Sequence, residues 1–337
     1  MGKQLKEFLA KKNIEISVKR YGIQALGSMA KGLFASLIVG LILKVLGQKL
    51  NIPLLIDFYE IAKTMMGPAI GVAVAYGLEA PPLVMFTSAV TGGAGAELGG
   101  PVGAFLAAVI GAEFGKLISK ETKLDIVLTP SIVIITGGLM AKFVGPGINS
   151  FMKYLGQVIM KATQLQPVPM GVIVSTLMGM ALTLPISSAA IGLMLKLSGL
   201  AAGAATVGCS AQMVGFAVMS YRENGMGGLV SQGLGTSMLQ MPNIVHNPLV
   251  WIPPTLSGAI LGPLATTVFK MKNIPIGSGM GTAGLVGQFG TIEAMNSNVL
   301  WPILLLHFIL PAILTIIFAE LMRKWGLIKE NDLLLDL

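Results

Sequence analysis

Long apolar runs recur along this chain from residue 32 to residue 319, and several are long enough to cross a lipid bilayer. They are continuously apolar, whereas the strands of a transmembrane β-barrel alternate in polarity. The chain is 54% hydrophobic and 11% charged, while a soluble domain carries about a quarter charged residues. The sequence therefore predicts an all-α polytopic membrane protein embedded in the lipid bilayer.

The net charge of +8 comes largely from basic residues at the ends of the apolar runs. Such flanks are typical of cytoplasmic segments that contact anionic lipid, so we expect cytoplasmic N- and C-termini and no nucleic-acid partner. The flanking residues are Lys3, Lys6, Lys11, Lys12, Lys19, Arg20, Lys116, Lys120, Lys123, Arg323, Lys324 and Lys329. Lys142, Lys153, Lys161, Lys270 and Lys272 would then fall outside, so the charge rule supports this orientation only in part.

The apolar pattern predicts about ten transmembrane helices in two five-helix halves. The expected spans are 21–47, 58–79, 82–98, 101–119, 126–147, 169–195, 199–221, 227–245, 248–271 and 299–322. The expected organisation is a cytoplasmic amphipathic helix at 1–20, a first membrane repeat at 21–147, an amphipathic interfacial connector at 148–167, a second membrane repeat at 168–322 and a cytoplasmic tail at 323–337.

The stretch TGGAGAELGGPVG, residues 91–103, interrupts an apolar region with six glycines and a carboxylate. The region around it, from Pro81 to Ile118, is too long for one crossing, because about twenty residues suffice for a transmembrane helix. We therefore expect two spans that meet near these glycines.

A weak internal repeat relates the two halves. GLFASLIVG at 32–40 resembles GVIVSTLMG at 171–179, and FTSAVTGGAGAELGGP at 86–101 aligns with GTSMLQMPNIVHNPLV at 235–250. With five spans in each copy the repeats would be inverted, as in many secondary transporters with broken helices. The alternative is chance recurrence of small residues among 43 glycines.

The second alignment places Glu97 opposite His246, which gives each half one ionisable residue at a helix break. Ionisable residues at membrane depth are costly and usually face a cavity or a partner. We therefore expect a substrate site centred on these two residues, with further polar contacts from Asn243, Asn247, Gln240, Thr91, Ser187, Ser188 and Gln288. The structural alternatives are a helix-capping role for Glu97 and a packing role for His246; for His307 we expect an interhelical hydrogen bond.

Two other segments also predict broken helices. TLPISSAAIG, 183–192, places a proline and two serines within a span, and is expected to unwind or kink. The glycine-rich segment 274–291 is too polar for lipid, so we expect a re-entrant or cavity-lining loop that closes one side of the site.

These segments, above all IPIGSGMGTAGLVGQFG, together resemble the EIIC-type membrane-subunit family of the bacterial sugar phosphotransferase system that includes the perfringolysin regulator protein. The resemblance covers nearly the whole chain. It implies a homodimeric carrier in the bacterial inner membrane, with a membrane Glu and a His contacting the sugar. Cys209 lies in an apolar run and suits no phosphocysteine relay, so separate soluble EIIA and EIIB proteins would supply any phosphorylation.

We therefore expect a membrane carrier of a small polar solute, a sugar or sugar-like compound, that works by alternating access. No cofactor or metal is expected, because the chain has one cysteine and two histidines and lacks the common nucleotide and zinc motifs. A membrane-bound sensor or regulator that binds a ligand or protein without transport is the alternative. An intramembrane enzyme ranks last, because no nucleophile–base pair is evident.

Overall fold

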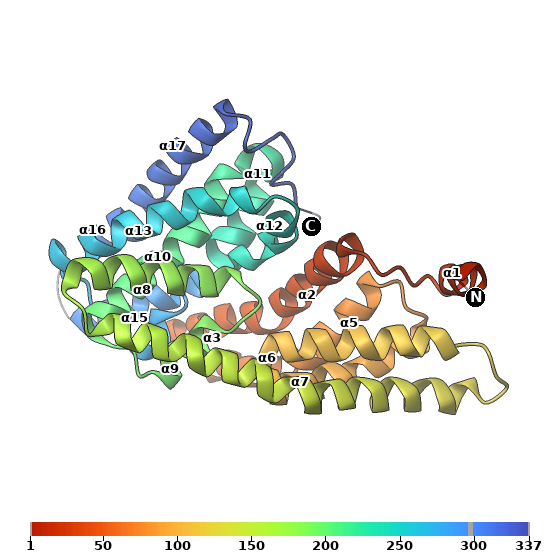
Figure 1. Cartoon of the computed structure of the whole chain (residues 1–337). Coiled ribbons are helices and arrows are strands. Elements are labelled where there is room, and N and C mark those ends of the chain that lie inside the picture. Colours follow the sequence, from red (N-terminus) through yellow and green to blue (C-terminus); the bar gives the residue numbers. More distant parts are fainter. Residues whose placement is uncertain (1, 296–298, 336–337) are drawn as a thin grey trace. The chain divides into compact units, whose positions relative to one another are not determined.

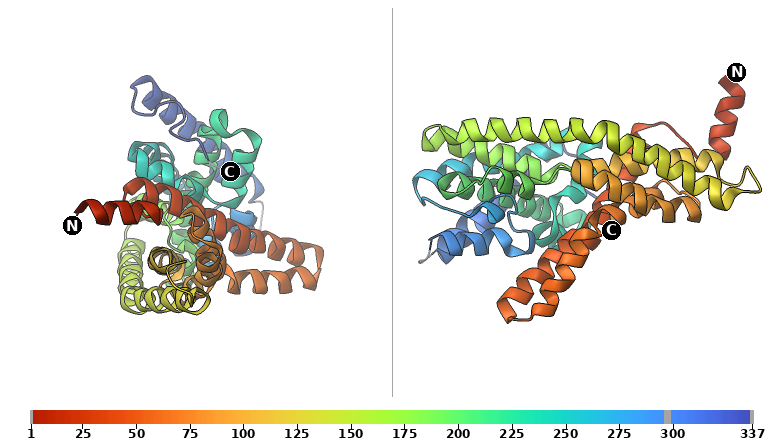
Figure 2. Two further views of the ribbon diagram at one scale, coloured as in Figure 1. Left: turned by 90° about the vertical axis from the view of Figure 1, so that its right-hand side faces the viewer. Right: turned by 90° about the horizontal axis from the view of Figure 1, so that it is seen from below.

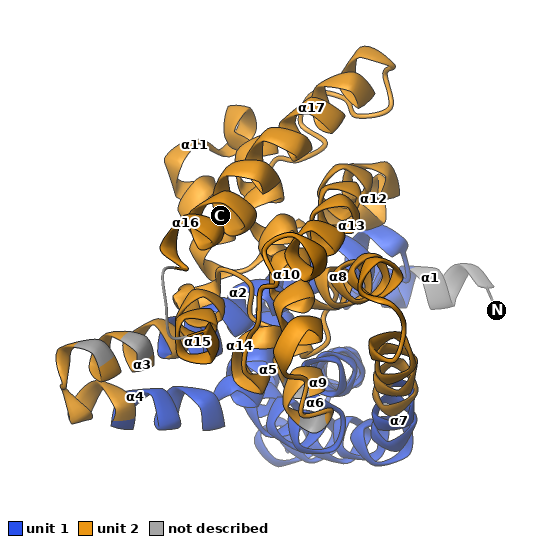
Figure 3. Cartoon of the chain, turned by 90° about the vertical axis from the view of Figure 1, so that its left-hand side faces the viewer, with its two compact units in different colours: residues 1–40, 57–151 blue, residues 41–56, 152–337 orange. Residues whose placement is uncertain are grey.

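The computed structural model describes residues 2–295 and 299–335 and is helical, with no β-strand in these ranges. The chain forms two compact units, coloured separately in Figure 3. The first unit comprises Met1–Gly40 and Asp57–Phe151, and the second comprises Leu41–Ile56 and Met152–Leu337. Both units therefore combine segments that are distant in sequence.

Six helices of the described chain are long and apolar enough to cross a membrane. They are Lys19–Gln48, Pro82–Ile118, Asp125–Thr163, Gly199–Met219, Pro248–Thr267 and Leu300–Lys324, and two shorter apolar helices cover Met66–Gly77 and Pro167–Thr183. The membrane class predicted from composition is confirmed, whereas the count of ten spans and the inverted repeat stay predictions.

Figure 1 labels most of the helices of the N-terminal half of the chain, which belong to the first unit except for residues 41–56 and 152–163, which belong to the second. They are α1 (Gly2–Lys11), η1 (Lys19–Ala25), α2 (Leu26–Leu33), η2 (Phe34–Ile38), α3 (Val39–Leu50), α4 (Pro53–Thr64), α5 (Met66–Gly77) and α6 (Pro82–Ile118), followed by α7 (Asp125–Thr163). Residues 19–50 form one continuous helical run, which agrees with the expected first span. The expected second span, 58–79, is interrupted at Met65, where α4 gives way to α5.

Helix α6 is a helical hairpin that turns at Gly99 and Gly100. Gly100 has φ +61° and ψ −152°, a conformation open essentially to glycine alone. The two arms run antiparallel, because a Cβ at Gly95 would lie 2.3 Å from the carbonyl oxygen of Gly103, and one at Gly115 would contact Val84. The predicted junction of two helical segments near the glycines is confirmed.

Small residues let α5 and α6 pack backbone to backbone. A Cβ at Gly71 would lie 2.0 Å from the Ser88 carbonyl oxygen, and one at Gly92 would lie 2.3 Å from the Gly67 carbonyl oxygen. Close approach of this kind is a principal source of helix association in lipid, where the hydrophobic effect between helices is absent.

Helix α7 continues through the residues expected to form a separate interfacial connector. Figure 2 shows it as one long yellow-green helix, which ends at Thr163 shortly before Pro167. Pro130 and Pro146 lie inside it without ending it. The expected element at 148–167 is thus mostly the C-terminal part of α7.

The second unit is built around α10 (Gly199–Met219), which is buried along almost its whole length. It packs against α8 (Pro167–Thr183), α13 (Ile252–Thr267) and α17 (Leu310–Lys324). A Cβ at Gly208 would lie 1.9 Å from the Ser175 carbonyl oxygen, so α10 and α8 also touch through their backbones. The short elements of the unit surround this core and comprise α9 (Ser188–Met194), α11 (Tyr221–Val230), η3 (Ser231–Gly235), η4 (Ser237–Gln240), α12 (Met241–His246), η5 (Pro248–Trp251), α14 (Pro275–Ser278), η6 (Ala283–Leu285), α15 (Val286–Met295), α16 (Leu300–Ile303) and η7 (Leu304–Ile309).

The expectation of one helix across 227–245 is wrong. The chain there is divided among α11, η3, η4 and α12, with Thr236 in an extended conformation at φ −159°. The Thr236 side chain accepts a hydrogen bond from the Met238 backbone, which starts the following turn in the manner of a helix N-cap. The segment therefore starts a new, capped turn at Thr236 and does not continue as a single helix.

Candidate functional site

The glycine-rich loop of the second unit lines a cavity of about 420 Å³. Leu41, Lys44 and Gln48 of α3 form one wall. The other wall comprises Ile274, Ile276, Val286, Phe289, Gly290, Ile292 and Glu293. A volume in this range is typical of small-molecule sites, which are mostly apolar with a few polar groups. The segment contains α14, η6 and the start of α15, and part of it lines this cavity; its role as a re-entrant loop that closes one side of the substrate site stays a prediction.

The turn of this loop is buried against the middle of α10. Gly281 has φ +51°, and a Cβ there would lie 2.7 Å from the Cys209 backbone and 2.8 Å from the Ser210 nitrogen. Gly284 and Leu285 also have positive φ values. Irregular backbone at membrane depth is tolerated where protein covers it, which is the setting observed for this turn.

Asn273 anchors the start of the loop to its end. Its Nδ2 lies 2.6 Å from Thr206 Oγ1, 2.9 Å from the Gly287 carbonyl oxygen and 3.2 Å from Thr291 Oγ1. Its backbone forms an isolated antiparallel bridge with Gly199. Sequence reasoning missed Asn273, because a single asparagine before a proline-containing turn carries no distinctive signal.

A second helix break lies beside this loop. Helix α8 ends at Thr183 and α9 begins at Ser188, so the predicted interruption within TLPISSAAIG is confirmed. Ser188 Oγ donates to the Gly279 carbonyl oxygen at 2.6 Å and so joins the break to the glycine-rich loop. The neighbouring Ser187 is half-buried.

Gln212 of α10 connects the ends of several broken segments. Its Oε1 accepts hydrogen bonds from Thr183 Oγ1 at 3.0 Å and from Trp251 Nε1 at 2.9 Å. Its Nε2 donates to Thr255 Oγ1 at 2.9 Å, and Thr183 Oγ1 lies 2.8 Å from Ser237 Oγ. This buried amide thus joins the end of α8 to η5 and α13, while Thr183 itself contacts η4.

Gln288, a predicted substrate contact, faces the last span. Its Nε2 lies 3.0 Å from Nδ1 of His307, and both residues are buried. The expected interhelical hydrogen bond of His307 is confirmed. His307 lies in the π-helical segment η7, a local widening that is frequent at functional positions.

Three other predicted residues bind the C-terminal tail of the chain. Asn243 Nδ2 donates to the Leu334 carbonyl oxygen at 3.0 Å, and Asn247 Nδ2 donates to the Leu327 carbonyl oxygen at 2.9 Å and to Asp332 at 2.7 Å. Gln240 donates to the Leu333 carbonyl oxygen at 3.1 Å. The intervening His246 is exposed at the end of α12.

In the first unit, Glu97 is exposed two residues before the Gly99–Gly100 turn. Thr91 is buried, and its Oγ1 donates to the Ser88 carbonyl oxygen at 3.1 Å. The segments of Glu97 and His246 both end at helix breaks, as expected from their alignment. Their pairing in one substrate site stays a prediction.

The first unit also contains a buried charged cluster that sequence reasoning missed. Lys116 Nζ lies 2.9 Å from Glu113 Oε2, 2.8 Å from the Asn13 carbonyl oxygen and 3.1 Å from the Leu78 carbonyl oxygen. Arg20 also donates to the Leu78 carbonyl oxygen, just past the end of α5. Cations placed at exposed C-terminal carbonyls are stabilising there. The sequence feature that could have indicated this cluster is a glutamate and a lysine three residues apart inside an apolar helix.

The chain has helices long and apolar enough to span a membrane, and some of its helices are interrupted where other protein covers the backbone. It also has a mostly apolar cavity with a few polar residues in its lining. These features define a multi-pass helical membrane protein with the plan of a solute carrier. The chain belongs to the family described as Phosphotransferase system, EIIC, whose model matches residues 23–335. It is therefore a membrane permease subunit for sugar transport in a bacterial membrane, and it works with soluble phosphotransferase components. No curated protein and no solved structure matches the chain.

Proposed function

We propose that the cavity beside the glycine-rich loop binds the transported solute, a sugar or sugar-like compound, and that transport proceeds by alternating access. The observation that carries the proposal is the loop itself, which lines the cavity on one side and packs its buried turn against α10 on the other. A loop in this position links solute binding to the core of the unit.

The cavity walls offer the groups that a sugar requires. Gln48 and Glu293 supply hydrogen-bonding side chains, and Lys44 adds a cationic donor. Phe289 supplies an aromatic surface for the apolar face of a sugar ring, with isoleucine and valine side chains around it. Apolar walls with a few convergent polar groups are the usual composition of a small-molecule site.

A sugar panel tested by thermal shift on purified protein, followed by calorimetry, examines this proposal. We expect Glu293→Gln to weaken binding of the identified sugar by about tenfold or more, because hydrogen bonds to a charged group contribute roughly 1.5–3 kcal/mol. Glu15→Gln, a matched change at an exposed residue of the N-terminal segment, is expected to leave the affinity unchanged. Equal affinity of the Glu293→Gln variant and the unaltered protein would reject the cavity as the sugar site.

Phosphorylation of the solute would come from separate soluble EIIA and EIIB chains. Cys209 is fully buried and its Sγ lies 3.4 Å from the Met178 carbonyl oxygen, so it is a poor phosphoryl acceptor. A homodimer with cytoplasmic N- and C-termini is part of the same proposal.

A sensor or regulator would share the cavity and differ in moving no solute. Binding without flux is the result that favours this second function, and the uptake measurement described in the Discussion separates the two.

A further inference from the structure

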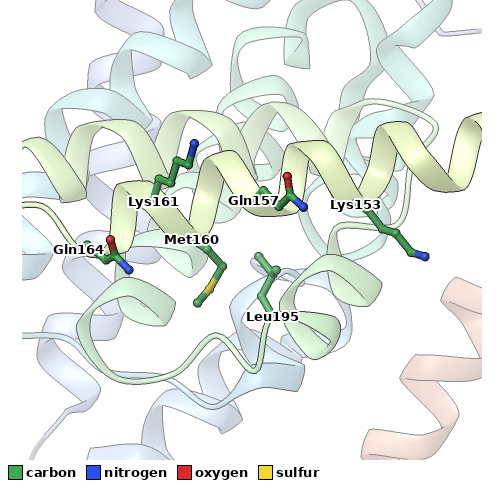
Figure 4. Close-up of a pocket in the computed structure, with 6 residues that line it drawn as sticks. All are labelled: Lys153, Gln157, Met160, Lys161, Gln164 and Leu195. Carbon is green, nitrogen blue, oxygen red and sulfur yellow. The ribbon is translucent and has the colours of Figure 1, made fainter.

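The C-terminal part of α7 carries a basic hollow of about 410 Å³ on the second unit. Figure 4 shows the six side chains that line it, which are Lys153, Gln157, Met160, Lys161, Gln164 and Leu195. Lys153, Gln157, Met160 and Lys161 lie along one face of α7, Gln164 directly follows the end of that helix, and Leu195 follows α9 beside Met160. The hollow thus combines two cations and two amides with an apolar floor.

The charge of this hollow is uncompensated. No acidic side chain lines it, and neither Lys153 nor Lys161 forms an ion pair with any residue that the structure describes. The sequence has no aspartate or glutamate anywhere between Asp125 and Glu223. The positive potential of the hollow is therefore not neutralised by acidic residues nearby in the sequence, and it favours an anionic ligand.

The length of α7 places the hollow near the membrane surface. At about 1.5 Å per residue, the apolar part at 126–147 accounts for roughly the 30 Å thickness of a hydrocarbon core. Lys153 lies six residues past this part, about 9 Å along the axis, and Lys161 lies about 21 Å past it, toward water. The exposed Tyr154 next to Lys153 is an aromatic residue of the kind enriched at the membrane–water interface. Headgroup phosphates lie close to the level of Lys153, at the membrane end of the hollow.

We propose that this hollow binds the headgroup of an anionic phospholipid. The two lysines lie two helical turns apart, about 12 Å along the axis, so the hollow offers two separate cationic contacts along α7. Gln157 and Gln164 donate hydrogen bonds to phosphate or glycerol oxygens, and Met160 and Leu195 contact the glycerol and the first acyl carbons. Basic pockets between transmembrane helices bind such headgroups by the same chemistry.

Native mass spectrometry of the purified, delipidated protein tests this proposal with diphosphatidylglycerol and phosphatidylcholine as probes. The unaltered protein should retain diphosphatidylglycerol preferentially. The double variant Lys153→Gln/Lys161→Gln should bind it about 30-fold more weakly, since each lysine near a membrane surface contributes about 1 kcal/mol. Lys270→Gln/Lys272→Gln removes the same charge from another exposed pair and should retain the lipid.

The charge-retaining variant Lys153→Arg/Lys161→Arg should keep the preference, and it distinguishes lost binding from lost folding. Equal retention by both glutamine double variants would overturn the proposal. Lysine-dependent binding of inorganic phosphate in calorimetry, without any preference between the two lipids, would also overturn it, because the hollow would then be a site for free phosphate.

Discussion

At the scale of single residues, the turn of α6 depends on one backbone conformation. Gly100 adopts φ +61° and ψ −152°, and a Cβ added there would meet no atom within 4 Å. The need for glycine at this position is therefore conformational and does not come from packing.

We expect Gly100→Ala to destabilise the protein by about 1–3 kcal/mol, because this backbone region is strained for every other residue. Gly138→Ala is the matched control: its Cβ also meets no atom within 4 Å, but the residue lies in the regular helix α7. Thermal unfolding in detergent measures both variants. An equal melting temperature for the two would contradict the assigned conformation of Gly100.

The buried charges of the first unit lead to a second prediction at this scale. Lys116→Ala leaves Glu113 buried without its ion-pair partner, and removal of one partner from a buried pair typically costs about 3–5 kcal/mol. Lys123→Ala removes an exposed lysine from the loop that follows α6 and should change stability little. Comparable loss of folded protein in both variants on heating would argue against the buried cluster.

The sequence alone predicted where helices break and which side chains form hydrogen bonds better than it predicted the partners of those side chains. The interhelical bond of His307 and the breaks near Glu97 and Ser188 follow from local rules, because ionisable and helix-breaking residues are rarely left in lipid. The partners of Asn243 and Asn247 lie some eighty to ninety positions away in the tail. No local pattern distinguishes an asparagine that binds a solute from one that binds a distant carbonyl.

At the scale of elements, the C-terminal tail is held to α12 and its flanks by side chains that were predicted to bind solute. Asn224 also holds the tail, since its Nδ2 donates to the Leu333 carbonyl oxygen at 2.8 Å and its Oδ1 accepts from the Leu335 nitrogen at 2.8 Å. The tail is thereby an integral part of the second unit.

The double variant Asn243→Ala/Asn247→Ala should release this tail. Three hydrogen bonds to the tail are lost, and each contributes about 0.5–1.5 kcal/mol, so the tail should open at least tenfold more often. Hydrogen exchange at Leu327–Leu335 reports the opening, with Asn149→Ala as a control at an exposed asparagine of the first unit. Unchanged exchange in the double variant would show that other contacts hold the tail.

Segment length and hydropathy predicted some of these elements and not others. Length arithmetic identified the α6 hairpin, because 37 residues exceed one crossing. It did not identify the division of 227–245, where α11, which holds Gly225 at φ +58°, ends at Val230 and the short helix α12 begins at Met241, next to Pro242. Only eight of the nineteen residues in that segment are apolar, so its polar residues, glycines and Pro242 were the available sign that a single helix does not continue there.

At the scale of the whole molecule, membership of the EIIC family and a cavity beside a covered loop support the account of a sugar carrier. Glu97 and His246, each exposed at a helix break, do not line this cavity, and their contact with the transported solute stays a prediction from the sequence alone. Variants of the cavity residues and of these two residues are therefore compared in one transport measurement.

Uptake of the identified sugar into proteoliposomes is the measurement that tests the central claim most directly. We expect saturable flux that falls by about tenfold or more in Glu293→Gln, in step with the loss of a charged hydrogen-bond acceptor. Glu97→Gln and His246→Ala are expected to reduce flux as well, while Glu15→Gln retains it. Sugar binding without flux in the unaltered protein would contradict the carrier and favour a sensor, and full flux in Glu293→Gln would contradict the assigned cavity.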